Sequence, residues 1–515
     1  MIWLSVALAG GGPLSTQVLY DSNSPDSEAL ALDYVEARQL PESALCAVEG
    51  PFEPTLSYED FDARIRQPWL ACRGESTDVL VLMKGLPYRV GLSTFHASVE
   101  AVLQVGEGTQ GGEPIAGRGQ SLSGSTAYAS VKNPAVVFAG HYGDDFTLSN
   151  PTQSYYTTTS GLTRQAWPVG FERDRSWVWP GIDLTGELMV VSRIDGYSFE
   201  DAHALIDRAL AAEAQPPTGT WLCMAAADSA RGPRDPECEY ATRMLAALGV
   251  DSTWLNTHDS ALTGHTVLAY LTGAANLKGS IDGLDYAPGA YADNITSYGA
   301  VPNNFCDPEV EDCSESQTSI ARFVRAGASA VHGTVAEPLN NVFPNAGTLL
   351  LYSQGYALGE SVLYNTRHLY WQNLLLGDPL MTPFDERPTV GWDGWATADH
   401  PRGVASVEVY KDGELVTDLP EGEHEVLVVA TAKGRTVQVP EFEVGAITID
   451  PQTQGWGWFS VTIEPWSPPD TGDTGDTGGP TPSEDCGCGA PGSAVPLWAL
   501  VALGVGLRRV RQDGA

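Results

Sequence analysis

Three short apolar runs in the middle of the chain constrain its fold more than any other feature. They span residues 265–271, 289–295 and 328–335, and each passes into loop sequence that contains Gly, Ser or Pro. Apolar runs of this length, bounded by turn residues and separated by helical patterns, are typical of buried parallel strands. Ligands and catalytic groups gather in the loops that follow such strands. The runs therefore predict where a site would lie, and they leave its chemistry open.

The alternation of strand and helix patterns extends on both sides of these runs. Before them, predicted strands alternate with helical patterns over residues 28–39 and 58–72, and after residue 188 the capping sequence 198–201 opens another helix. Two further helices are predicted at 317–325 and 347–364. Right-handed crossovers make such a pattern an α/β domain with a Rossmann-like, mostly parallel sheet flanked by helices. We expect it to cover residues 16–385, with an irregular Gly-rich and aromatic-rich insertion at about 106–185.

The sequence pattern changes after residue 387. Alternating β runs and a Lys-Asp-Gly turn at 411–413 predict a small β-sandwich domain over 387–464. Residues 465–489 form a Thr/Gly/Asp/Pro linker, most simply a flexible spacer, with weak calcium binding by its Asp residues as the alternative. The apolar run that begins at 490 is followed by Arg508, Arg509 and Arg511, so residues 490–511 are predicted to form a transmembrane helix whose Arg end lies in the cytoplasm.

The length and charge of the chain limit the classes of function that it can have. The 515 residues predict two or three domains. They carry 28 basic and 65 acidic residues, a net charge of −37, which argues against nucleic-acid binding because that needs Lys and Arg against phosphates. The acidity fits the solubility of an exported protein.

The first residues bear on export. Residues 1–12 read as a signal segment, because Ala7-Leu-Ala9 has the small-x-small form of a cleavage site. No Lys or Arg precedes the apolar run, so an N-terminal strand, or a true start other than Met1, is the alternative.

The cysteines fit an oxidising compartment. Six of the eight precede the linker, and proximity along the chain favours the disulfides Cys46–Cys72, Cys223–Cys238 and Cys306–Cys313 among fifteen pairings. No cysteine pair has zinc spacing and no His-Glu-x-x-His sequence occurs, so we expect neither a metal nor a cofactor.

Two regions resemble known families. The tail, in which Cys486-Gly-Cys488 lies between the linker and the apolar helix with its Arg cluster, resembles the MYXO-CTERM class of C-terminal sorting signals. That resemblance implies export, recognition by a membrane-embedded sorting protease, processing near Cys486 and Cys488, and a membrane-tethered place in the cell envelope or at the cell surface.

The body resembles an uncharacterised family of exported bacterial proteins that has no assigned activity. The sequences that carry the resemblance are Val18–Ser27, Ser192–Gly196, Ala287–Ala290, Ala336–Leu339 and Gly377–Pro379. The later half of that family distantly resembles the caspase-like fold of gingipain-type cysteine peptidases, which place a His after one strand and a nucleophilic Cys after the next. Here the loop at 272–274 has no His and the loop at 293–297 has no Cys. The resemblance therefore implies the fold without its thiol machinery.

Two hypotheses for the function follow. The first is a surface-displayed, non-catalytic α/β protein that binds an unknown ligand or partner at the former active-site edge. The second is a peptidase-like or esterase-like hydrolase with Ser297 as nucleophile and His332 as base, and with Asp293 and Glu337 near them. A short distance between Ser297 and His332 would favour the second.

Overall fold

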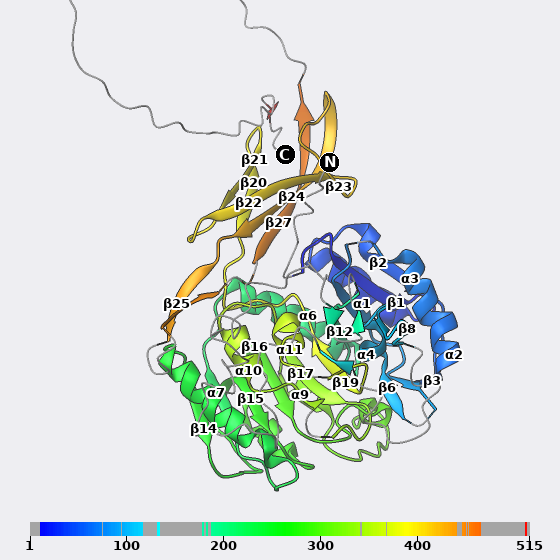
Figure 1. The fold of residues 1–515 in the computed structure, drawn as a ribbon, viewed down its shortest axis with the longest axis vertical. Coiled ribbons are helices and arrows are strands. Elements are labelled where there is room, and N and C mark those ends of the chain that lie inside the picture. Colours follow the sequence, from blue (N-terminus) through cyan, green and yellow to red (C-terminus); the bar gives the residue numbers. More distant parts are fainter. Residues whose placement is uncertain are drawn as a thin grey trace, which may run out of the picture.

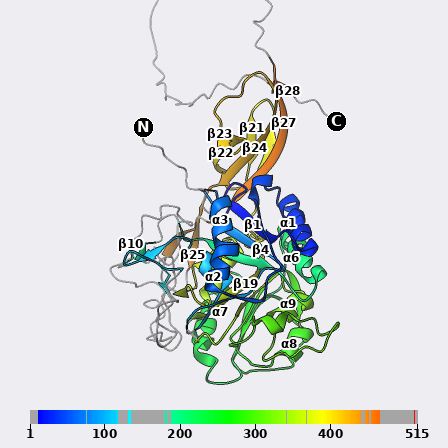
Figure 2. The same ribbon diagram turned by 90° about the vertical axis from the view of Figure 1, so that its right-hand side faces the viewer.

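The computed structural model describes residues 11–116, 131–133, 178–179, 182–183, 187–439, 445–464 and 510–511, except for 75, 94, 340–341, 367, 450 and 452. Figure 1 shows two bodies, an α/β body below and an antiparallel β region above it. Figure 2 shows the β region continuing from one end of the α/β body. The prediction of an α/β domain followed by an all-β region is confirmed at this level.

A ten-stranded sheet is the centre of the α/β body. Its order is β14-β13-β15-β16-β17-β19-β12-β4-β1-β2. The strands are β1 (Thr16–Asp21), β2 (Leu45–Val48), β4 (Val79–Met83), β12 (Val190–Ile194), β13 (Thr220–Met224), β14 (Ser252–Leu255), β15 (Thr266–Thr272), β16 (Asp285–Asn294), β17 (Ala330–Thr334) and β19 (Asn373–Gly377). The three apolar runs of the sequence are thus the adjacent parallel strands β15, β16 and β17, as predicted.

β19 lies between β17 and β12 in the middle of the sheet and runs antiparallel to β17. Gly11 is packed so tightly that a Cβ atom there would lie 2.6 Å from Leu380 and 2.8 Å from Val79. Leu380, which follows β19, and Val79, at the start of β4, therefore both lie close to Gly11. Tyr88, which follows β4, stacks on Phe305, which follows β16, at 4.2 Å between ring centroids.

The two sides of the sheet repeat one arrangement. Counted along the chain, β1, β2, β4 and β12 have the order 2-1-3-4, and β13, β14, β15 and β16 have it too. This is the order of doubly wound sheets, in which ligands bind beyond the carboxyl ends of the strands.

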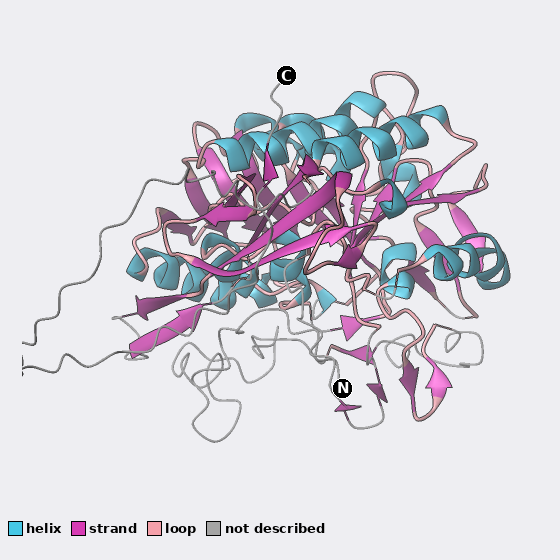
Figure 3. Cartoon of the chain, turned by 90° about the horizontal axis from the view of Figure 1, so that it is seen from above, coloured by secondary structure: helices cyan, strands magenta, loops and turns pink. Residues whose placement is uncertain are grey.

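Helices cover both faces of the sheet (Figure 3). One layer joins α1 (Pro25–Ala37), α6 (Phe199–Ala214), α9 (Ile320–Ala326) and α8 (Lys278–Gly283), and the other includes α7 (Asp235–Ala247), α10 (Gly347–Ser353), α11 (Leu358–Leu363) and α4 (Val99–Leu103). The segment at 58–72 is helical throughout as α2 (Tyr58–Phe61), the π-helical turn η2 (Asp62–Arg66) and α3 (Gln67–Cys72).

Local signals place the helix ends. Ser24 caps α1 by accepting from the backbone N–H of Ser27, and Ser198 and Asp201 form the predicted capping box of α6. The single helix expected over 347–364 is wrong, because two helices meet at Gly355, whose φ of 94° belongs to a helix end. A Cβ at Gly355 would also lie 2.5 Å from Asp385.

The β region has its own small core. A five-stranded sheet runs β23 (Glu414–Leu415), β22 (Val404–Lys411), β24 (Gly422–Ala432), β27 (Gln454–Ile463) and β28 (Val510–Arg511), and the hairpin β20 (Thr389–Trp392)–β21 (Ala396–Asp399) packs on β24 and β27. Buried residues of this core include Trp392, Val426 and Val461. A second hairpin, β25 (Arg435–Val439)–β26 (Gly445–Ile449), reaches back to the α/β body, where Arg435 donates to the carbonyl of Gln354.

Shorter elements complete the described chain. They are the strands β3 (Thr55–Ser57), β5 (Arg89–Gly91), β6 (His96–Ser98), β7 (Thr109–Gln110), β8 (Glu113–Pro114), β9 (Val131–Lys132), β10 (Val178–Trp179), β11 (Ile182–Asp183) and β18 (His368–Leu369), and the 3₁₀ turns η1 (Glu42–Ala44), η6 (Gly232–Arg234) and η7 (Pro302–Phe305). They lie mostly around the expected insertion and the carboxyl edge of the sheet.

The cysteines follow the expectation in part. Cys46–Cys72 and Cys306–Cys313 are disulfide-bonded. Cys223 on β13 and Cys238 on α7 are instead free, buried thiols that lie in contact with each other. Proximity along the chain correctly predicted that Cys223 and Cys238 are in contact, but it does not indicate whether they form a disulfide.

Several predictions lie outside the described residues. They concern most of the insertion, the linker, Cys486, Cys488, all but the last two residues of the signal segment, and residues 490–509 of the predicted transmembrane helix with Arg508 and Arg509. The two described residues of that predicted helix, Val510 and Arg511, instead form strand β28 beside β27. Among the described residues no helix is long and apolar enough to span a membrane.

Candidate functional site

The site is built where β16 and β17 approach the carboxyl edge of the sheet. Asp293 on β16 and His332 on β17 are paired in register, and each is 1% exposed. The Oδ2 atom of Asp293 lies 3.6 Å from Nδ1 of His332. The sequence placed these residues on neighbouring strands, and the structure brings them together.

Arg234 holds the other side of Asp293. It comes from η6, just before α7, and its Nη1 lies 2.7 Å from Oδ2 of Asp293. Its Nη2 donates to the carbonyl oxygens of Thr272 (2.8 Å) and Asp293 (2.9 Å), so one guanidinium joins the ends of β15 and β16. Burial alone would raise the pKa of Asp293, but the charge of Arg234 and the contact with His332 lower it below its ordinary value.

The second ring nitrogen of His332 has a hydrogen-bond partner, whereas Nδ1 forms no hydrogen bond within the described residues. Its Nε2 lies 3.1 Å from Oδ1 of Asn373, at the start of β19. The ring packs edge-on against Phe343 with 5.5 Å between centroids. His332 is therefore enclosed by Asp293, Asn373 and Phe343.

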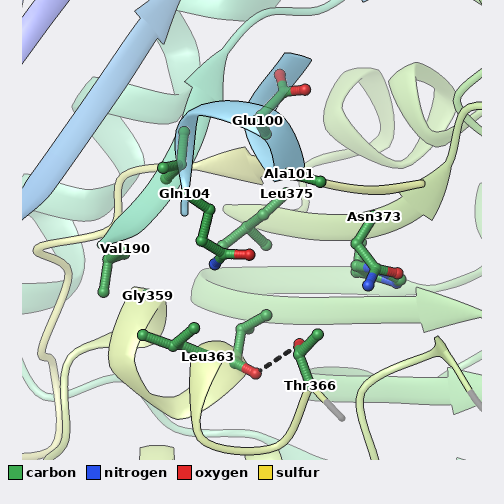
Figure 4. Close-up of a pocket in the computed structure, with 12 residues that line it drawn as sticks. Glu100, Ala101, Gln104, Val190, Gly359, Leu363, Thr366, Asn373 and Leu375 are labelled. Atoms are coloured by element: carbon green, nitrogen blue, oxygen red, sulfur yellow. Dashed lines mark hydrogen bonds between the residues drawn. The ribbon is translucent and has the colours of Figure 1, made fainter. Parts of the chain in front are cut away.

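Beyond His332 and Asn373 lies a cavity of about 30 Å³ between β12, α4 and α11. Figure 4 shows Glu100, Gln104 and Asn373 around it. A space of this size takes about two water molecules. It is too small for a substrate, since ligand pockets start at roughly 300 Å³.

Glu100 ties this cavity to a buried charge cluster. Its Oε1 accepts from Nε of Arg193 at 2.6 Å, while its buried Oε2 has no hydrogen-bond partner in the described part of the chain. Burial raises the pKa of Glu100, and the charge of Arg193 offsets this only in part. Asp195 extends the cluster to Lys84, at 3.0 Å, and to the hydroxyl of Tyr88. Arg193 and Asp195 also form an ion pair at 3.7 Å, wholly buried.

The loops after β15 and β16 are fastened to each other by side chains. Asn294 accepts from the backbone N–H of Ala274 at 2.7 Å and donates to the carbonyl of the same residue at 2.9 Å. Within the loop after β16, the Oε1 atom of Gln317 accepts hydrogen bonds from both the Thr296 hydroxyl and the Tyr298 N–H.

Ser297 and Glu337 do not join the Asp293–His332 pair. Ser297 is half-buried, and its carbonyl oxygen accepts from the Thr334 hydroxyl at 3.0 Å. No hydrogen bond in the described chain links its hydroxyl to His332, whose nitrogens face Asp293 and Asn373. Glu337 is exposed in the loop after β17.

Sequence reasoning missed Arg234, Asn373 and Glu100. Arg234 lies in the sequence Gly-Pro-Arg-Asp-Pro at 232–236, which reads as an exposed turn. Asn373 and Glu100 come from segments far along the chain, so no spacing links them to His332. The described residues hold no group of three His, Cys, Asp or Glu side chains that could bind a metal ion.

Comparison of the chain with protein-family models, with curated proteins and with solved structures found no match. The site's own geometry therefore has to carry the functional argument.

Proposed function

We propose that this chain is an exported, non-catalytic binding protein with a caspase-like α/β body, followed by a small β-sandwich and a C-terminal membrane tether. The two disulfides support export, because such bonds persist in oxidising compartments. The tether rests on the sequence of the tail alone.

One observation supports the non-catalytic assignment. Side-chain hydrogen bonds close the carboxyl edge of the sheet, where a catalytic nucleophile and base would have to lie. Asn294 locks the loop after β16 to the loop after β15, and Arg234 crosslinks the strand ends beneath them. A nucleophile needs a base within hydrogen-bond reach and open space for the reacting atom. The base candidate, His332, is 1% exposed and faces other partners.

Hydrolysis assays test the proposal. The full chain is incubated with a panel of fluorogenic peptides and p-nitrophenyl esters, beside Ser297→Ala and His332→Gln variants whose folding is checked by circular dichroism. We expect wild type and both variants to give the same background rate. Turnover that disappears in either folded variant overturns the non-catalytic assignment.

A hydrolase is the second candidate, and the Asp293–His332 contact favours it. A carboxylate beside one nitrogen of a His is the arrangement that orients a general base. In this proposal Ser297 attacks, His332 takes its proton, Asp293 holds the imidazole and Glu337 lies at the rim. It requires His332 Nε2 to exchange Asn373 for the Ser297 hydroxyl, so the same assays decide between the two candidates.

The tether and its partner, a membrane-embedded sorting protease, are tested separately. Membrane fractions are compared for the native chain, for a chain truncated after residue 464, and for a Cys486→Ser, Cys488→Ser double variant. We expect the native chain with the membranes, the truncated chain in the soluble exported fraction, and the double variant unprocessed. A truncated chain that stays with the membranes contradicts the tether.

A further inference from the structure

The junction of the two bodies holds a groove of ligand size. It is a solvent-open depression of about 670 Å³ between α1, the 3₁₀ turn and strand that follow it, and β27. Figures 1 and 2 show α1 at the end of the α/β body nearest the β region. Its apolar lining consists of Leu32, Val35, Leu40, Leu45 and Trp458. Binding sites of roughly 300–1,000 Å³ occur preferentially at such domain boundaries.

The groove is held in shape without a ligand. The indole N–H of Trp458 donates to the carbonyl of Gln39 at 3.1 Å, and that of Trp456 donates to the carbonyl of Arg38 at 2.9 Å. Both residues therefore fasten β27 to the end of α1. Leu32, which also lines the groove, is 51% exposed, so its side chain is open to a ligand.

The charge of the groove has one sign. Its ionisable lining residues are Glu36 and Glu42, and neither forms an ion pair or a hydrogen bond through its side chain within the described part of the chain. Two uncompensated carboxylates beside an indole favour a cation, which gains from both the charges and the ring face. The apolar floor favours aliphatic side chains next to that cation.

We propose that this groove binds a peptide segment of a partner protein in which Arg or Lys alternates with large apolar residues. The inference rests on the proposed binding function and assigns it a site away from the carboxyl edge of the sheet. The aliphatic side chains would lie on Leu32, Val35 and Leu40, and the cations would face Glu36 and Glu42.

Fluorescence anisotropy tests the site with a fluorescein-labelled peptide amide of sequence Gly-Leu-Arg-Leu-Arg-Gly. Two control peptides replace its Arg residues by Glu or its Leu residues by Ser. We expect the first peptide alone to bind the full chain, with affinity that falls as salt rises to about 0.5 M. We expect Glu36→Lys and Leu32→Asp each to weaken it by about tenfold or more.

Glu28→Lys is the matched control, because it makes the same charge change at an exposed position of the same helix, outside the groove. It should leave binding within about twofold of wild type. Equal binding by wild type, Glu36→Lys and Leu32→Asp places the site elsewhere and overturns the inference while the binding function stands. Equal binding of the Ser-containing peptide reduces the interaction to charge and overturns it too. Absence of binding also overturns it, whereas cleavage of the peptide contradicts the non-catalytic function itself.

Discussion

At the scale of single residues, the Arg234–Asp293–His332 group is a buried charge network. Its members are at most 2% exposed in their side chains, and Asp293 is the anion shared by the other two. Buried ion pairs gain little over apolar packing, but removing one partner leaves a charge without compensation. The network therefore fastens the edge of the sheet whether or not it also has a chemical task.

Replacing Asp293 by Asn should show this cost. Arg234 would keep its two carbonyl acceptors but lose its counter-charge, and we expect a loss of about 3–5 kcal/mol in the free energy of unfolding, measured with urea. The matched control is Asp282→Asn, which breaks the half-exposed pair with Arg322 and should cost no more than about 1 kcal/mol. Equal losses in the two variants would contradict a structural role for the buried network.

The thiols of Cys223 and Cys238 give a second prediction at this scale. Burial, and then the contact with Cys223, raise the pKa of Cys238 well above its ordinary value, so the reactive thiolate is suppressed. Iodoacetamide should label both residues only after unfolding, and Cys46, Cys72, Cys306 and Cys313 only after reduction, as read by peptide mass mapping. A peptide pair crosslinked through Cys223 and Cys238 in the unreduced native protein would contradict this assignment.

At the scale of elements, the join between β17 and β19 holds the two sides of the sheet together. Gly377 ends β19 with a φ of 128°, and a Cβ there would lie 2.7 Å from the Cβ of Ala330 and 2.8 Å from the carbonyl oxygen of Ser329. Only glycine allows this close approach in this backbone conformation.

Gly377→Ala should therefore lower the free energy of unfolding by about 3 kcal/mol, from backbone strain plus a displaced strand. Gly413→Ala is the control, because Gly413 also has a positive φ, 81°, but has no atom within 4 Å of an added Cβ. Gly413→Ala should lower the free energy of unfolding by about 1 kcal/mol, because it adds only the strain of a positive φ and no steric clash. Urea denaturation of the two variants separates packing from conformation, and a Gly377→Ala cost as small as that of Gly413→Ala would contradict the argument.

Elements also show what the sequence could predict. Strands β15, β16 and β17 were found from length and flanking turns, because buried parallel strands leave that local signal. The proximity of Asp293 and His332 is predicted because these residues lie on two of the three strands. The partners of this pair, Arg234 and Asn373, are fixed by the chain's path through space, and a turn-rich sequence such as 232–236 does not reveal that its Arg is buried. The break at Gly355 escaped prediction because the apolar pattern continues through it.

At the scale of the whole molecule, one carboxylate links three parts of the chain. Glu213, at the end of α6, lies 2.7 Å from Nη1 of Arg38 after α1 and 3.1 Å from Nε of Arg387, where the β region begins. Arg38 also pairs with the buried Asp378 after β19, and Arg387 lies over the ring of Trp456 at 4.8 Å. Asp378 also accepts a hydrogen bond from the backbone N–H of Leu380. The charge of Glu213 therefore supports the contact between the two bodies.

That charge makes the junction sensitive to acid. Burial would raise the pKa of Glu213, but Arg38 and Arg387 outweigh burial and lower it from 4.5 to about 2. A carboxyl whose pKa is lowered by folding contributes stability that is complete above the pKa of the unfolded chain and is lost as the pH falls toward the folded value. For Glu213 this contribution, up to about 3 kcal/mol, should disappear between about pH 5 and pH 2.

Urea denaturation from pH 7 to pH 2.5 measures this contribution in wild type and in Glu213→Gln. We expect the variant to be less stable at pH 7, because Arg38 and Arg387 lose an anion, and to lose less further stability on acidification. Glu28→Gln, at an exposed position of α1, is the control and should follow the wild-type pH curve. If Glu213→Gln and wild type lose equal stability between pH 5 and pH 2.5, the junction does not depend on the ionised carboxylate. The contact between the two bodies would then rest on the indole hydrogen bonds of Trp456 and Trp458 and on the packing around them.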